Sequence, residues 1–248
     1  MAGLSGDAFV KALQSDPIQF IVGPTAVPLT ISKALLCHKS ETFAKLLSKP
    51  GLLELRLPNV GADVGKIFVC WCYQGRLQGL GVNPSAADRR EWKELLINLW
   101  LLGDDYGIPS LQNQAMKQLT GLFVTPYLLN KKDIEDVWSH KPSHEELQGL
   151  LICTLVAQLE APNAAKTIYD YEDLAALPKF MAKLYKALQM WVTFDVPVKA
   201  KKNKWVMLLQ SERLQKGFLV SEMMRKVSAQ AARAPARPFA PGEIIEID

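Results

Sequence analysis

Two short apolar segments near the start of the chain, residues 18–22 and 27–31, constrain its fold more than any other feature. Both are rich in the β-branched and aromatic residues that suit the pleated surface of a sheet. Gly23 and Pro24 lie between them and supply the backbone conformations that tight turns use. Ser32 comes next and can cap a helix through its side-chain oxygen. The chain is therefore predicted to begin with a strand, a turn, a second strand, a helix and, after a break, another helix.

A third strand and three amphipathic helices are predicted after these elements. Residues 53–57 alternate leucine with charged side chains and stop at Pro58, which is typical of a half-buried strand. Apolar residues then recur with helical spacing in three stretches, and the last stretch begins at Pro109, a favoured first position of a helix. Residues 78–90 contain glycine and proline and are expected to form an exposed loop between the first two helices.

Three stretches of this region carry a resemblance to a known family. They read GPTAVPLTISKALLCHKSETFAKLL, LRLPNVGADVGKIFVCWCYQGRL and LLINLWLLGDDYGIPSLQNQAMKQL. In this order they resemble the BTB/POZ family, most of all the stand-alone BTB proteins of filamentous fungi, over residues 16–125. The resemblance implies an α/β (α+β) class with the BTB/POZ fold, a small mixed sheet beside a cluster of helices. It also implies self-association and recognition of other proteins.

An all-helical extension is predicted over residues 126–196 and a flexible basic tail over residues 197–248, with one amphipathic stretch in the tail. The stretch DIEDVWSHKPSHEELQGLLICTLV is similar to the region after the BTB domain in the fungal proteins. A later helix, kinked or split at Pro178, is expected to bury one face with Leu174, Leu177, Met181, Leu184, Leu188 and Trp191. Residues 199–248 hold ten Lys or Arg against five Asp or Glu. The basic excess therefore lies in the tail, which argues against a nucleic-acid interface on the folded part.

The sequence does not predict an enzyme, a cofactor or a metal site. It lacks the P-loop, G-x-S-x-G, H-E-x-x-H and C-x-x-C patterns. His140 and His144 are four residues apart, but Pro142 between them prevents the single helical face of a paired ligand site. Four cysteines without a signal peptide predict reduced thiols, and no apolar run reaches membrane length. We expect a protein of the cytoplasm, the nucleus or both, without a membrane partner.

The resemblance points to one surface for self-association as a homodimer. Residues 7–15 can form one or two helical turns, or can fray as chain termini do. An N-terminal segment often contributes to the interface of BTB dimers. The residues that this comparison assigns to self-association are Phe9, Leu13, Ile18, Phe20, Lys33 and Leu36. Two positions depart from the family pattern, because Pro17 stands where an Asp usually precedes the first strand and Ser32 stands where a His is common.

A second surface is expected to recruit another protein, in the way that BTB adaptors bridge a cullin-type ubiquitin ligase to a substrate. By resemblance this surface comprises Asp63, Lys66, Tyr73, Asp104, Asp105, Tyr106 and Pro109. The chain departs from many cullin-binding BTB domains, because residues 64–66 lack the acid of their hydrophobic-x-Glu feature.

The alternative is a nuclear, chromatin-associated regulator that dimerises through the BTB unit and contacts nucleic acid with its basic tail, although no zinc finger or other reader domain accompanies it. A short nuclear-import pattern, of a kind that also occurs on solvated loops, comprises Lys201, Lys202 and Lys204. A segment that resembles a SUMO-interaction motif comprises Ile244, Ile245, Ile247 and Asp248. Such a motif adds an extended apolar strand to a sheet of its partner.

Overall fold

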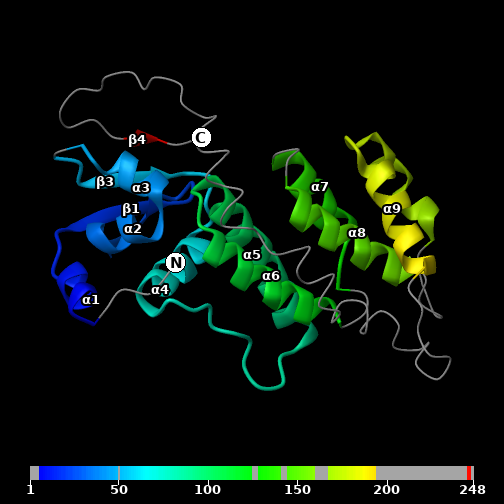
Figure 1. Cartoon of the computed structure of the whole chain (residues 1–248), viewed down its shortest axis with the longest axis horizontal. Coiled ribbons are helices and arrows are strands. Elements are labelled where there is room, and N and C mark those ends of the chain that lie inside the picture. Colours follow the sequence, from blue (N-terminus) through cyan, green and yellow to red (C-terminus); the bar gives the residue numbers. More distant parts are fainter. Residues whose placement is uncertain are drawn as a thin grey trace. The chain divides into compact units, whose positions relative to one another are not determined.

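A small mixed sheet organises the N-terminal part of the chain (Figure 1). The computed structural model describes residues 6–49, 51–124, 128–140, 144–159, 167–193 and 245–246. Strand β1 (Pro17–Val22) pairs antiparallel with β2 (Val27–Ser32) and parallel with β3 (Glu54–Leu57). Strand β4 (Ile245–Glu246) pairs parallel with β3, so the strand order is β2-β1-β3-β4. The chain is therefore an α+β protein with a mixed sheet, which confirms the predicted class.

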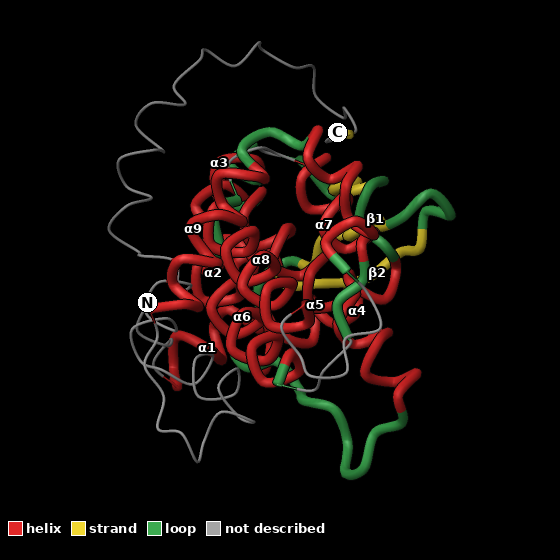
Figure 2. The backbone as a smooth tube through the Cα atoms, turned by 90° about the vertical axis from the view of Figure 1, so that its right-hand side faces the viewer, coloured by secondary structure: helices red, strands yellow, loops and turns green. Residues whose placement is uncertain are grey.

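Helices make up most of the rest of the described chain (Figure 2). The earlier ones are α1 (Gly6–Leu13), α2 (Lys33–Lys39), α3 (Glu41–Leu46), α4 (Ala62–Gln74), α5 (Ala86–Asp105) and α6 (Pro109–Phe123). The later ones are α7 (Lys131–His140), α8 (Glu145–Leu159), the 3-10 helix η1 (Ile168–Ala176) and α9 (Phe180–Thr193). No helix among the described residues combines the length and the apolar character needed to cross a lipid bilayer.

The chain divides into two compact units, and each takes its residues from separate stretches of sequence. Of the described residues, the first unit contains 6–81, 98–115 and 245–246. The second unit contains residues 82–97 and those described between 116 and 193. Helices α5 and α6 therefore contribute to both units, whereas the sequence suggested segments that succeed one another along the chain.

The core of the first unit is built on one face of β1. Ile18, Phe20 and Val22 alternate along this strand and are at most 1% exposed. The ring of Phe20 lies 6.3 Å from that of Phe43 in α3 and 5.7 Å from that of Phe68 in α4, measured between centroids. Rings at these separations gain edge-to-face or offset contacts in addition to the burial of their apolar area. The sheet face and the two helices therefore share one aromatic cluster.

A buried ion pair holds α5 and α7 together in the second unit. Lys93 Nζ lies 2.5 Å from a carboxylate oxygen of Asp133 and 3.3 Å from the carbonyl oxygen of Leu128, and the Lys93 side chain has no exposed surface. The same carboxylate accepts the backbone N–H of Asn130 at 2.8 Å, while the Asn130 side chain accepts the N–H of Asp133. Burial raises the pKa of Asp133, and the bonds from Lys93 and Asn130 oppose that shift. This charged pair was not predicted from the sequence.

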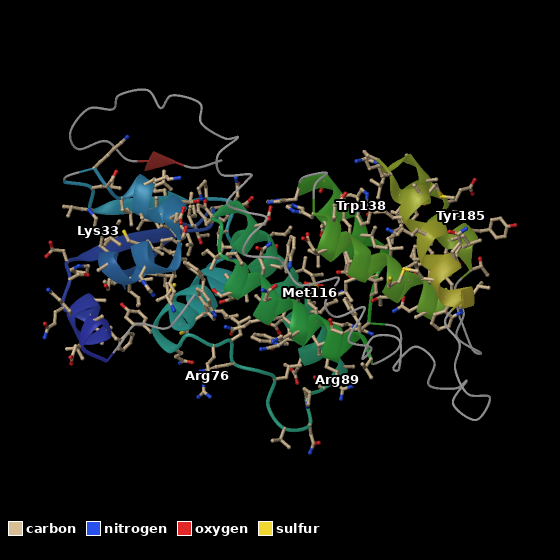
Figure 3. The ribbon with its side chains drawn as sticks, viewed as in Figure 1. Lys33, Arg76, Arg89, Met116, Trp138 and Tyr185 are labelled. Atoms are coloured by element: carbon tan, nitrogen blue, oxygen red, sulfur yellow. The ribbon has the colours of Figure 1, made fainter. Side chains whose placement is uncertain are left out.

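Pro178 separates η1 from α9, which confirms the predicted break. The indole N–H of Trp138 donates to the carbonyl of Pro178 at 3.0 Å, and its ring packs edge-on against Phe180. The buried face of α9 begins at Phe180 rather than at the neighbouring Met181, which is 53% exposed. The prediction that Met181 lies on the buried face is therefore wrong. Tyr185, one turn later, points away from the helix into solvent (Figure 3).

Removing one partner of the buried pair is expected to destabilise the chain strongly. Lys93→Met leaves the Asp133 carboxylate buried without its cation, and such changes lower the free energy of unfolding by about 3–5 kcal/mol. Adding Asp133→Leu should restore part of that loss, because the double variant no longer buries a charge. Urea unfolding followed by circular dichroism measures both effects.

Lys131→Met is the matched control, because Lys131 of α7 pairs with Asp173 at the surface. Exposed ion pairs contribute little to stability. Equal losses for Lys93→Met and Lys131→Met would contradict the structural role of the buried pair.

Candidate protein-interaction surface

Helix α1 presents an apolar face to solvent. Val10 and Leu13 are 52% and 43% exposed, and their spacing of three places them on the same side of the helix. Ala12 is buried on the opposite side, and Phe9 is half-buried between the two. Of the two alternatives for this segment, the structure has the helix. We call the face formed by Phe9, Val10 and Leu13 the α1 surface.

The side chain of Ser32 fixes the end of α1 to the start of α2. Its hydroxyl donates to the carbonyl of Ala12 at 2.5 Å and accepts the N–H of Leu35 at 3.1 Å, which caps α2 as predicted. Because a serine hydroxyl has one hydrogen, the 2.8 Å bond between Ser32 and Ser15 must be donated by Ser15. Ser15 in turn accepts the N–H of Ala34 at 3.1 Å. The two hydroxyls therefore form a hydrogen-bond chain in which each bond has a defined direction.

The backbone around Ser32 extends this connection to α4 and to Asp16, the residue before β1. The N–H of Ser32 donates to the Tyr73 hydroxyl of α4 at 3.2 Å, and the N–H of Lys33 donates to the carbonyl of Asp16 at 3.2 Å. A helix of eight residues is not stable by itself in water. The bonds at Ser32 therefore help to keep the short α1 helix in place with its apolar face exposed.

The residues predicted for self-association divide into two groups. Phe9 and Leu13 belong to the α1 surface, and Lys33 is half-buried at the start of α2 (Figure 3). Ile18, Phe20 and Leu36 are at most 1% exposed and form part of the core. Their assignment to a contact surface is corrected, because side chains facing the aromatic cluster cannot meet a partner while the unit remains folded.

The residues predicted for partner recruitment also fall into two groups, one exposed or half-buried and one buried. Asp63 and Lys66 are exposed at the start of α4 and pair with each other at 2.8 Å. Asp104 and Asp105 are half-buried at the end of α5. Tyr73 is half-buried as well, and its hydroxyl accepts the N–H of Ser32.

Tyr106 and Pro109 are buried in the connection between α5 and α6, inside the first unit. The Tyr106 ring stacks on Phe43 with centroids 4.4 Å apart, and burial raises the pKa of its phenol. Gly107 comes next with φ of +64°, and the N–H of Ile108 donates to the Gly103 carbonyl at 2.7 Å, which is the Schellman ending of a helix. The expectation that Tyr106 and Pro109 form a partner surface is therefore corrected.

The tail motifs lie mostly outside the described residues. This holds for Lys201, Lys202 and Lys204 and for Ile244, Ile247 and Asp248. Ile245 is the first residue of β4.

Two histidines come together although the sequence argued against it. The rings of His140, at the end of α7, and His144, before α8, are stacked with centroids 5.5 Å apart. His140 belongs to α7 and His144 precedes α8, whereas the expectation from the sequence concerned a single helical face. Within the described part of the chain, no three His, Cys, Asp or Glu side chains are grouped so that they could hold a metal ion.

A scan of the chain against models of known protein families finds no match, and a search of curated proteins finds none either.

Replacing the Ser32 hydroxyl is expected to release α1. Ser32→Ala removes the N-cap of α2, at a cost of about 1 kcal/mol. It also removes the bond that ties the Ala12 carbonyl to α2, at a cost of about 1 kcal/mol, and leaves that carbonyl only the N–H of Ser15. Hydrogen exchange should accelerate at the amides of residues 10–13, and urea unfolding should report the lost stability. Ser48→Ala is the control, because that exposed hydroxyl bonds the nearby carbonyl of Lys45. Unchanged exchange in α1 of the Ser32→Ala variant would contradict the anchoring role of Ser32.

Proposed function

We propose that this chain is a non-catalytic protein–protein interaction protein that self-associates through the α1 surface and recruits a second protein. The observation that carries the proposal is the exposure of Val10 and Leu13 on a helix that a hydrogen bond at Ser32 ties to α2. Single exposed apolar residues are common on proteins, but here two of them share one side of an anchored helix. A helix that is already formed loses less conformational entropy when a partner covers it than a segment that must fold on binding.

A symmetric dimer buries the most apolar area for a face of this size. In a twofold interface the same patch occurs on both subunits, so each buried side chain contributes twice. Val10 and Leu13 each have about half of their surface left to bury, which is about 1 kcal/mol per side chain from the apolar area. The resemblance of residues 16–125 to BTB/POZ domains supports the same function, since self-association is a property of that family.

Charge on the α1 surface is expected to prevent self-association. Light scattering of the unmodified chain should give about twice its mass of 27.6 kDa, whereas Leu13→Glu should give the monomer mass, because dimerisation would bury the introduced carboxylate. Val82→Glu is the matched control, since Val82 is 95% exposed in a loop. A mass near 27.6 kDa for the unmodified chain at every concentration would refute the proposal.

We further propose that the exposed start of α4 belongs to the recruiting surface, as in an adaptor of a cullin-type ubiquitin ligase. The proposal is supported by the resemblance and by the exposure of Asp63 and Lys66. Calorimetry with a purified cullin N-terminal region should detect binding, and Asp63→Lys should weaken it about tenfold or more. Glu91→Lys, which reverses an exposed acid of α5, should leave the affinity unchanged. No binding by the unmodified chain would exclude the adaptor function but leave self-association standing.

A further inference from the structure

The outer edge of β3 is covered by the C-terminal segment of the same chain. Ile245 lies opposite Leu55 and Glu246 lies opposite Arg56, in a parallel pairing that makes β4 the last strand of the sheet. Figure 1 shows β4 beside β3 on the side away from β1. The segment that resembled a motif for adding a strand to another protein's sheet thus adds a strand to its own.

The hydrogen bonds of β3 show which of its backbone N–H and C=O groups face β4. The carbonyls of Leu53 and Leu57 accept the N–H groups of Gln19 and Gly23, so they point toward β1. Because successive residues of a strand point their N–H and C=O groups to opposite edges, those of Glu54 and Arg56 point toward β4. Without β4, the backbone of these two residues would form an open edge, which other extended segments can join.

We propose that the β3 edge is a docking site for an extended acidic and apolar segment, and that the C-terminal segment of this chain is its ligand in cis. The backbone register supports this choice of ligand, since Ile245 and Glu246 lie opposite Leu55 and Arg56, and the tail sequence EIIEID consists of acids and isoleucines. The described pairing is two residues long. Its few backbone hydrogen bonds contribute little stability individually, so the tail is displaceable and closes the edge reversibly. This inference does not depend on self-association through α1.

Residue-resolved hydrogen exchange by NMR tests the docking in the full chain. The Arg56 amide should be protected, and Ile245→Pro should abolish its protection, because proline removes the N–H that would bond the Glu54 carbonyl and disfavours strand pairing. The Leu55 and Leu57 amides point toward β1 and should remain protected, which is the internal control. Protection should also persist on dilution, as an intramolecular contact requires. Unchanged exchange at Arg56 in the Ile245→Pro variant would overturn the proposal, and protection that fades on dilution would overturn docking in cis.

A binding measurement tests whether the edge accepts a separate segment. A chain that ends at Ala240 should bind a fluorescent peptide PGEIIEID about tenfold or more tightly than the full chain does, because the full chain's own tail competes. The peptide with proline in place of the residue corresponding to Ile245 should not bind. Equal affinity of both chains for the peptide, or no binding to the shortened chain while its circular dichroism shows it folded, would overturn the proposal.

Discussion

The position of β1 between an antiparallel and a parallel neighbour determines the rest of the first unit. A parallel neighbour cannot be reached by a tight turn, so the chain must cross over between β2 and β3, and α2 and α3 form that crossover. The buried face of β1 must then be covered by an element that packs closely against it. Gly65 of α4 allows it, because a Cβ atom there would lie 2.9 Å from the methyl carbons of Val22. The aromatic cluster results from this approach, since α4 carries Phe68 one turn later.

Ser32 connects this core to the proposed function. It is the last residue of β2 and caps α2, so the sheet fixes its position, and its hydroxyl then fixes α1. A small hydroxyl fits here because it both donates to the carbonyl of Ala12 and accepts the N–H of Leu35 within a buried space. In the BTB/POZ family, which residues 16–125 resemble, a histidine is common at this position. In this chain a serine instead joins three elements, and the exposed apolar residues of α1 depend on it.

Local patterns predicted the strands, the cap at Ser32, the helix starting at Pro109 and the break at Pro178, because these depend on neighbouring residues. Predictions that depended on three-dimensional surroundings were less successful. The alternation of Ile18 and Phe20 indicated one buried face, yet their assignment to a contact surface came from the family resemblance and was wrong. Met181 was misplaced because the chain leaves the helical conformation between η1 and α9, where Leu177 is extended and Lys179 has φ of +61°, so helical spacing does not continue across the break. Nothing in the local sequence marks Lys93 as buried, since its partner Asp133 is 40 residues away.

The central claim is that the chain functions by covering the α1 surface with another copy of itself. Hydrogen exchange of the amides in residues 10–13, measured at several protein concentrations, tests this claim most directly. We predict that exchange in α1 slows as the concentration rises, while exchange in β1, already buried in the single chain, does not change. Exchange in α1 that is independent of concentration would show that this face remains uncovered and would contradict the account.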